Sequence, residues 1–377
     1  MNTIYLDNAA TTPIDNDVID TITKVMKEIY GNPSSTHQLG RKAKAVVEGA
    51  RKSIAKHFNV SAGEVVFTAG GSEADNLILR NAVVNLNVKR IIISNIEHHA
   101  VLHTVEALEK EFDIVVEYVN LDEKGNIDYQ HLVELLRTAE TKTLVSLMHI
   151  NNELGNLLDI RKVSDICIEN NALFHSDTVQ TIGHYKIDLQ QIPIDFITAS
   201  AHKFHGPKGV GFAIIKKGFG IQPILIGGEQ ERGARAGTEN VHNIAGMHKA
   251  LDIAIANLER DKKYITELKS YFIDRLKTIV PQIQFNGHSD DPDKSSYIIV
   301  NARFPKELPM LLFNLDLKGI AASGGSACQS GSAQGSHVLN AILPESEVQK
   351  TSVRFSFSKY ITKKDLDYTL GVLKEWV

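Results

Sequence analysis

The sequence lacks several features that would place it outside the ordinary globular class. It has only two cysteines in 377 residues, Cys167 and Cys328, too few for a disulfide framework, which favours a reducing, cytoplasmic setting. No apolar run approaches the ~18–20 residues that a membrane-spanning helix needs. The first residues have neither the basic start nor the apolar core of a signal peptide. Acidic and basic residues nearly balance, at 45 and 41, so no basic face predicts nucleic acid as a partner.

The order of expected strands and helices indicates an α/β fold. From Val65 to Ile215, short apolar runs alternate with amphipathic stretches of helical period. This pattern is typical of a mostly parallel sheet covered by helices on both faces. After Asn240 the pattern changes to a long helical stretch, Val241 to Ile279, followed by an α+β tail. We therefore expect a large domain of residues 15–250 and a smaller domain formed by residues 1–14 and 251–377.

One stretch, SAHKFHGPKGVG from Ser200 to Gly211, has the strongest chemical character. It places Lys203 between two histidines directly after an apolar run, and glycine and proline residues then favour a tight turn. A lysine amine becomes nucleophilic when desolvation or neighbouring cations lower its pKa. Lys203 is therefore a candidate for a Schiff base beside a bound phosphate. A surface loop that happens to carry Lys and His explains this stretch alone equally well.

Polar side chains also follow several expected strands, whose carboxyl ends form the ligand-binding edge of such a sheet. TAGGSEADN offers two glycines and Ser72 to a phosphate at a helix N-terminus. In a simpler alternative, Ser72 is a helix N-cap with Asp75 in the capping-box position. Asp177 could likewise be only a helix cap. However, an acid one strand–helix unit before Lys203 is placed to keep the ring nitrogen of pyridoxal phosphate (PLP) protonated.

Two further residues differ from their surroundings. Cys328 lies in a Gly/Ser-rich loop, ASGGSACQSGSAQGS, whereas Cys167 lies in an apolar periodic pattern. We therefore expect Cys167 to be a core residue and Cys328 to be a reactive thiol on a flexible loop. Arg354 is a charge inside an otherwise apolar strand. It is either a solvated edge position or a group for bidentate capture of a carboxylate.

Taken together, these residues resemble the cysteine desulfurases of the fold-type I PLP enzymes, in the class-V aminotransferase group. The resemblance runs from residue 5 to residue 357 in the family's order. The long Gly/Ser loop around Cys328 is similar to that of the NifS/IscS-type (group I) branch. The matching motifs are YLDNAATTP, GNPSSTH, GGSEADN, EHHAV, HINNELG, HSDTVQTIG, SAHKFHGPKG, ERGARAGTENV, SGGSACQSG and VRFSF.

The resemblance implies a role for each matching residue and implies no metal. Lys203 forms the Schiff base with PLP and later moves the substrate's α-proton, and Cys328 attacks the substrate sulfur and leaves as a persulfide. His98 stacks on the cofactor ring and helps with proton transfer. The remaining implied contacts are Asp177 to the ring nitrogen, Gln180 to the ring hydroxyl, Gly71, Ser72, Ser200 and His202 to the phosphate, Thr238 to the phosphate of a partner subunit in a homodimer, Arg354 to the substrate carboxylate, and Asn152 to that carboxylate and the cofactor.

The implied reaction converts L-cysteine to L-alanine and passes sulfur to an acceptor protein, either an iron–sulfur scaffold or a tRNA-thiolation enzyme. Two departures from the family bear on that partner. Gln334 and Gly335 stand where the family usually has a Glu-Pro pair, and the chain ends soon after Arg354, whereas housekeeping relatives carry a longer tail that docks the scaffold. We therefore expect partner docking to differ here.

Two other functions stay open. The first is another PLP-dependent lyase or aminotransferase acting on a small amino acid such as selenocysteine, although a transaminase has no use for a reactive Cys328. The second is a non-catalytic sulfur carrier or regulatory partner that retains the fold. The presence of Lys203, Asp177, His98 and Arg354 argues against the second alternative.

Overall fold

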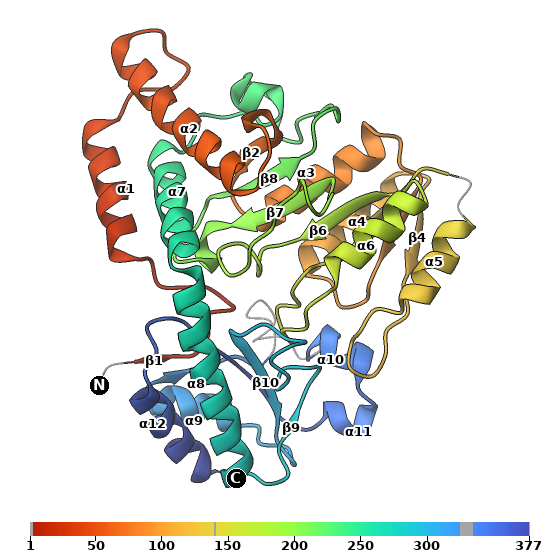
Figure 1. The fold of residues 1–377 in the computed structure, drawn as a ribbon, viewed down its shortest axis with the longest axis vertical. Helices are drawn as coiled ribbons and strands as arrows, with labels where there is room; N and C mark the ends of the chain where they lie inside the picture. The colour runs from red at the N-terminus through yellow and green to blue at the C-terminus, as the bar shows by residue number, and fades with distance from the viewer. Residues whose placement is uncertain (1–2, 139–140, 325–334, 377) are drawn as a thin grey trace.

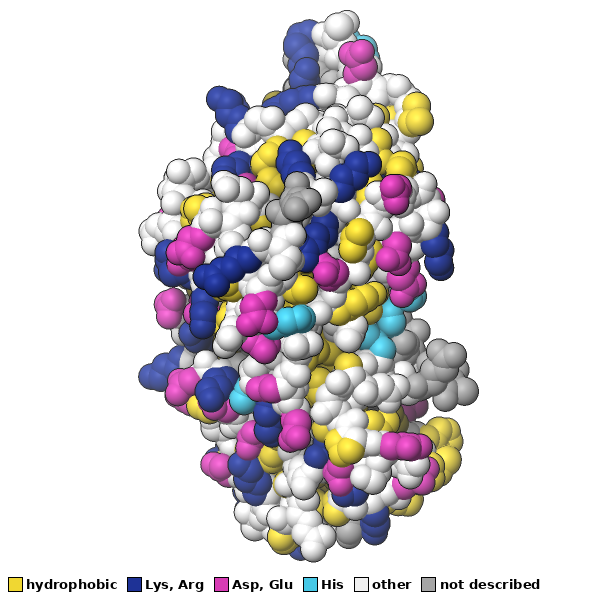
Figure 2. Space-filling view, turned by 90° about the vertical axis from the view of Figure 1, so that its right-hand side faces the viewer, with side chains coloured by type: hydrophobic (Ala, Val, Ile, Leu, Met, Phe, Trp, Pro, Cys, Tyr) yellow, Lys and Arg dark blue, Asp and Glu magenta, His cyan; other side chains and the backbone are white. Residues whose placement is uncertain are grey.

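The computed structural model describes residues 3–138, 141–324 and 335–376. Figure 1 shows a large sheet with its helices in the upper part of the view and a smaller sheet with its helices below, near both chain ends. Acidic and basic side chains are interspersed over the face shown in Figure 2, as the balanced composition predicts. Within the described ranges, no helix is long and apolar enough to cross a membrane.

A seven-stranded sheet forms the upper part. Its strands are β2 (Val65–Thr68), β3 (Arg90–Ile93), β4 (Val115–Tyr118), β5 (Thr143–Ser146), β6 (Leu173–Asp177), β7 (Phe196–Ser200) and β8 (Gly211–Ile215). The order across the sheet is β2-β8-β7-β6-β5-β3-β4. The strands from β7 to β4 pair in parallel, and β8 pairs antiparallel with both of its neighbours. The α/β class with a mostly parallel sheet is therefore confirmed.

Helices cover both faces of this sheet because successive strand residues point to opposite sides. In β3, Ile92 packs in one apolar cluster, whereas Ile91 and Ile93 pack in another. The first cluster also receives side chains from α1 (Asn16–Glu28), α2 (Gln38–His57), α5 (Tyr129–Arg137), α6 (Ile160–Glu169) and α7 (Val241–Ala256). The second cluster receives them from α3 (Gly71–Val84) and α4 (His99–Glu111).

The smaller part contains a three-stranded antiparallel sheet and a two-stranded parallel pair. Its strands are β1 (Ile4–Tyr5), β9 (Gln284–Phe285), β10 (Ile299–Arg303), β11 (Ile320–Ala321) and β12 (Ser352–Ser356). Its helices are α8 (Leu258–Ile279), α9 (Leu311–Leu317), α10 (His337–Ile342), α11 (Glu345–Val348) and α12 (Lys363–Lys374). The sheet order is β12-β10-β9, with β1 beside β11. One apolar cluster joins Ile4, Leu6 and Ala9 to side chains between residues 265 and 373.

The long helical stretch expected from Val241 to Ile279 is interrupted once, at Asn257. The backbone N–H and the side-chain amide of Asn257 both donate to the carbonyl of Ile253, at 3.1 and 2.9 Å. The backbone bond is the ordinary helical one, and the asparagine side chain adds a second bond to the same carbonyl of the preceding turn. α7 ends at this residue beside the large sheet, and α8 begins at Leu258 and continues into the smaller part.

Strand register brings the carboxyl ends of the large sheet together. Asp177 at the end of β6 is opposite Thr198 of β7. The smaller part reaches the same region through β12, where Arg354 forms a bridge with Ser323. A short bridge between Asp7 and Ser356 ties the N-terminal segment to β12. Residues from both ends of the chain therefore meet the strand ends at one place.

Candidate active site

A cavity of about 200 Å³ lies at these strand ends. Its lining combines backbone and side chains from the large sheet, the N-terminal segment and β12. The predicted site residues that it brings together are Gly71, Ser72, His98, Asn152, Asp177, Gln180, Ser200, His202, Lys203 and Arg354. The lining also includes Ala9, Ala10, Asp75, Met148 and Val179, for which the sequence suggested no site role. The individual functional roles of the lining residues stay predictions.

The start of α3 suits a phosphate. Gly70 is the N-cap, has φ +155° and contributes no side chain, and the first N–H groups of a helix have no intrahelical partner. A Cβ on Gly71 would stand 2.7 Å from a methyl of Val179, so this close approach requires glycine. Ser72 is the second residue of the helix. The alternative that Ser72 is the N-cap is therefore wrong.

Ser200 and His202 approach the same end of the cavity from β7. Ser200 is the last residue of β7 and is buried, and the 3₁₀ turn Ala201–Lys203 follows it. His202 Nδ1 lies 3.2 Å from Thr11 Oγ1. Burial, with the cation of Lys203 as the next cause, lowers the pKa of His202 to about 4. The neutral ring keeps one N–H, so this end offers a hydroxyl, a ring and backbone donors to an anion.

Asp177 provides the negative charge on the large-sheet side. Its Oδ1 accepts a hydrogen bond from the Val179 N–H at 2.8 Å, and the Thr198 hydroxyl lies 3.5 Å from the same oxygen. Burial, with the charge of Asp75 as the second cause, raises the pKa of Asp177 to about 6. A cation placed against the carboxylate would favour its ionised form. Asp177 therefore fits the predicted partner of a protonated ring nitrogen.

Asp75 is a second buried carboxylate in the cavity lining, and sequence reasoning considered it only as a capping residue. Its side chain is 1% exposed, and burial raises its pKa to about 7. Its Oδ1 lies 3.5 Å from Nε2 of His175, and neither atom has a hydrogen-bond partner within the described part of the chain. Helical spacing could have found it, because Asp75 follows Gly71 by one turn of α3 and so lies on the same helix face.

Lys203 contacts the N-terminal segment. Its Nζ donates to the carbonyls of Ala9 at 2.6 Å and Ala10 at 2.9 Å. Gln180 Nε2 donates to the same Ala9 carbonyl at 2.9 Å. The motif YLDNAATTP marked this segment as part of the family pattern, but alanine carbonyls have no side-chain signature. The sequence therefore could not show that they form a wall of the cavity beside Lys203.

His98 is the N-cap of α4, and its Nδ1 accepts a hydrogen bond from the Ala100 N–H at 3.1 Å. In the neutral ring Nε2 therefore carries the proton. Burial is the largest influence on His98 and lowers its pKa, which favours that neutral form. The His98 ring can stack on a cofactor ring while Nδ1 keeps its bond to the Ala100 N–H. To take up a proton at Nδ1, it must first break that capping bond.

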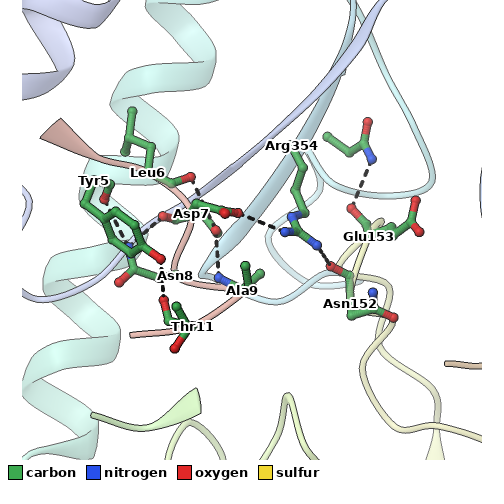
Figure 3. Close-up of polar contacts among 12 residues, drawn as sticks. Tyr5, Leu6, Asp7, Asn8, Ala9, Thr11, Asn152, Glu153 and Arg354 are labelled. Atoms are coloured by element: carbon green, nitrogen blue, oxygen red, sulfur yellow. Dashed lines mark hydrogen bonds and ion pairs between the residues drawn. The ribbon is translucent and has the colours of Figure 1, made fainter. Parts of the chain in front are cut away.

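Arg354 of β12 lines the cavity and, as Figure 3 shows, lies between Asp7 and Asn152. Its Nη1 donates to the backbone carbonyl of Asn152 at 2.8 Å, and its Nη2 donates to Asp7 Oδ1 at 2.9 Å. The residue is 1% exposed, so the alternative of a solvated edge position is wrong. Within the described ranges, Arg354 Nε and Asn152 Oδ1 are buried without a hydrogen-bond partner. This donor and this acceptor remain open for a ligand.

Three other predicted residues have different outcomes. Thr238 is exposed in the segment before α7 and is not part of the cavity lining of its own chain. Cys328 lies outside the described residues. Cys167 is 1% exposed on α6, and burial raises the pKa of its thiol. The prediction that Cys167 is a core residue is therefore confirmed.

The sequence profile of the family "Aminotransferase class-V" matches residues 4–369. The chain belongs to this family. A curated relative, "Cysteine desulfurase IscS" of Dictyoglomus turgidum, is 40% identical over 98% of this chain and 93% of its own length. The structure of a "NifS-like protein" has a TM-score of 0.91 at 34% identity, covering 99% of this chain and 98% of the other.

Another solved structure of this fold is described as "SspA in complex with cysteine". It has a TM-score of 0.79 at 28% identity and covers 96% of this chain and 100% of the other. These likenesses extend over nearly the whole chain, and they confirm the resemblance to NifS/IscS-type proteins.

Proposed function

We propose that the protein is a PLP-dependent cysteine desulfurase that converts L-cysteine to L-alanine. The observation that carries the proposal is that Lys203, Asp177, His98 and Arg354 line the same cavity. The names of the curated relatives and the cysteine-bound structural neighbour support the same substrate. In this proposal the cysteine becomes the donor of sulfur, and Cys328 becomes its first acceptor.

The residues of the large-sheet side fit the cofactor. Lys203 would attach it through Nζ, the start of α3 with Ser200 and His202 would hold its phosphate, and Asp177 its ring nitrogen. Gln180 would donate to the ring hydroxyl, for which it would exchange its present bond to the Ala9 carbonyl. When bound, PLP supplies an electron sink for the bond that breaks at the substrate's α-carbon.

The remaining steps belong to the protein's own groups. Arg354 binds the substrate carboxylate with its buried Nε–H, which lacks a partner, and Asn152 donates to the carboxylate from its side-chain Nδ2, because its Oδ1 can only accept. Lys203 Nζ takes the α-proton, and the carbonyls of Ala9 and Ala10 hold the resulting ammonium group. His98 takes the thiol proton of Cys328 after its capping bond opens.

The sulfur step balances without an external oxidant. The Cys328 thiolate attacks the substrate sulfur, a new S–S bond forms and the substrate's Cβ–Sγ bond breaks. The substrate carbon regains a proton to give alanine, and Cys328 is left as a persulfide. A thiol reductant or an acceptor protein then removes the outer sulfur. We propose an iron–sulfur scaffold or a tRNA-thiolation enzyme as that acceptor.

The proposal includes an assembly and a location. We propose a homodimer in which Thr238 reaches the phosphate site of the partner subunit, which its exposed position in its own chain supports. We also propose that residues 15–250 form the large domain and that residues 1–14 and 251–377 form the small one. The separate apolar clusters of the two sheets support this division. The proposed location is the cytoplasm.

The decisive experiment measures alanine and sulfide from L-cysteine in the presence of a thiol reductant. We expect both products from the wild type and almost none from Cys328→Ala. The matched control is Cys167→Ala, which removes the other cysteine, and we expect it to keep near-normal activity. Near-normal sulfide production by Cys328→Ala together with its loss in Cys167→Ala would refute the sulfur-transfer assignment.

A further inference from the structure

The ion pair between Asp7 and Arg354 joins the two ends of the chain at the edge of the cavity. The residues are 347 positions apart in sequence, and the Nη2–Oδ1 distance is 2.9 Å. The Arg354 side chain is 1% exposed and the Asp7 side chain 17%. Arg354 lines the cavity, whereas Asp7 is not among the lining residues. Figure 3 shows the Asp7 carboxylate against the guanidinium of Arg354, so Asp7 contacts the lining arginine without lining the cavity itself.

The backbone holds Asp7 in this place. Ser356, two residues after Arg354 on β12, receives hydrogen bonds at its carbonyl from the Asn8 side chain at 2.9 Å. Its hydroxyl accepts from the Ala9 N–H at 2.8 Å, and its own N–H donates to Leu6 at 2.7 Å. These bonds lie on both sides of Asp7. The distance between the Asp7 carboxylate and Arg354 is therefore set by the sheet and not by a flexible side chain alone.

Burying the guanidinium of Arg354 in a strand is costly unless a negative charge accompanies it. Asp7 supplies that charge. The same charge also acts on any anion that binds to Arg354 from the cavity side, because Coulomb interactions in a poorly solvated region extend over several ångströms. One carboxylate bound at Arg354 already brings the local charge of the three groups to minus one. A second acidic group placed near this pair would meet three groups whose summed charge is already negative.

We propose that Asp7 is a specificity-determining residue, because it partly neutralises the charge of Arg354. The cavity therefore accepts ligands with one carboxylate and disfavours ligands with a second acidic group. For the proposed reaction, this selects amino acids with an uncharged side chain or a thiol over acidic amino acids. The inference rests on the carboxylate-binding role of Arg354 in the proposed function. It adds that the selection comes from a residue behind the arginine.

The test compares propionate, which has one carboxylate, with succinate, which has two. Apparent Kd values are measured on the PLP-loaded protein from the change in cofactor absorbance and from ligand-induced shifts in Tm. We expect the wild type to bind propionate more tightly than succinate. Asp7→Asn keeps the size of the side chain and removes its charge. We expect it to bind propionate about tenfold more tightly and to gain still more for succinate.

Two variants serve as controls. Asp7→Glu keeps the negative charge, so the preference for propionate should remain. Asp15→Asn removes another carboxylate near the chain start, whose ion pair with Lys359 at 2.7 Å lies outside the cavity lining. We expect this matched change to leave both affinities as in the wild type. If Asp7→Asn does not fold, the wild type and Asp7→Glu still test the expected preference.

The outcomes separate this inference from the proposed function. A wild type that binds succinate as tightly as propionate would overturn the inference, whatever the variants do. Equal weakening of both ligands in Asp7→Asn would also overturn it, because Asp7 would then only hold Arg354 in position. If the affinities shift as expected but the protein forms no alanine from cysteine, the proposed function fails and the charge selection stands.

Discussion

Two aspartates on opposite sides of the site differ in how the protein treats their charge. Asp177, on the large sheet, is buried, and its pKa is raised to about 6 mainly by burial. Asp7, beside the small sheet, is paired with Arg354 at 2.9 Å. The large-sheet side therefore carries a charge that is costly until a cationic ligand arrives. On the small-sheet side, Asp7 already neutralises the charge of Arg354 within the protein. A ligand anion that binds Arg354 there must share the guanidinium with Asp7.

This difference predicts opposite effects of removing the two charges. Loss of the Asp177 charge should stabilise the folded, cofactor-free protein, because a buried charge is removed, and should weaken cofactor binding. Loss of Asp7 should leave a buried cation without compensation and harm folding, while anion binding strengthens. On both sides of the cavity, removing the charge therefore changes stability and ligand affinity in opposite directions. Stability rises where the ligand supplies the counter-charge, as at Asp177, and falls where the protein supplies it, as at Asp7.

The largest effect is expected at Arg354, where the small-sheet side meets the substrate. Arg354→Gln removes charge-assisted hydrogen bonds to the substrate carboxylate, each worth roughly 1.5–3 kcal/mol. We expect the apparent KM for cysteine to rise between tenfold and a hundredfold, with a smaller change in kcat. Steady-state alanine formation measures both. An unchanged KM would show that the carboxylate binds elsewhere.

Asp177→Asn tests the large-sheet side in the cofactor-free protein. A folded-state pKa above the ordinary value means that the native state binds the proton more tightly, so Asp177 costs stability as pH rises from about 4 to about 6. Above pH 6 this cost is on the order of 2–3 kcal/mol. We therefore expect Asp177→Asn to raise Tm by a few degrees at pH 7.5 and to weaken PLP binding about tenfold or more.

Thermal unfolding between pH 4 and pH 8, with and without PLP, checks this prediction. Asp252→Asn is the control, because this carboxylate pairs with His57 and His248 on the outer helices and is 41% exposed. A cofactor-free Asp177→Asn protein that is less stable than the wild type at pH 7.5 would contradict the account of its buried charge.

The smallest effect is expected at Cys167, which belongs to neither side. Its side chain is in the core of α6, and substitution by alanine removes one buried sulfur atom. We expect Cys167→Ala to cost about 1–2 kcal/mol of unfolding free energy and to leave cofactor and cysteine binding unchanged. Chemical denaturation and a PLP titration measure the two effects separately. A loss of PLP affinity would show that core packing around Cys167 helps to shape the cofactor site.

The fold was predictable because it follows from local patterns. Short apolar runs in strands such as β3 and helical periodicity in α6 are visible in the sequence, and they specify buried layers. Asn257 was harder to foresee, because one residue that can cap a helix interrupts an otherwise continuous helical pattern. Local patterns therefore indicate which elements form, but less reliably where one ends.

The site was predictable only where a side chain carries a recognisable chemical group. Lys203, Asp177 and Arg354 stood out for that reason. The carbonyls of Ala9 and Ala10 and the ion pair of Asp7 with Arg354 did not, because they depend on contacts between segments hundreds of residues apart. Physical contacts of this kind become visible only when the chain is folded.

The central claim is that the strand ends assemble a PLP site around Lys203. The most direct measurement is reduction of the PLP-loaded protein with borohydride, followed by digestion and mass spectrometry of the labelled peptide. We expect one labelled residue, Lys203, and no label on Lys208, an exposed lysine in the turn that follows. A label on Lys208 or on any other lysine, with Lys203 unmodified, would contradict the account.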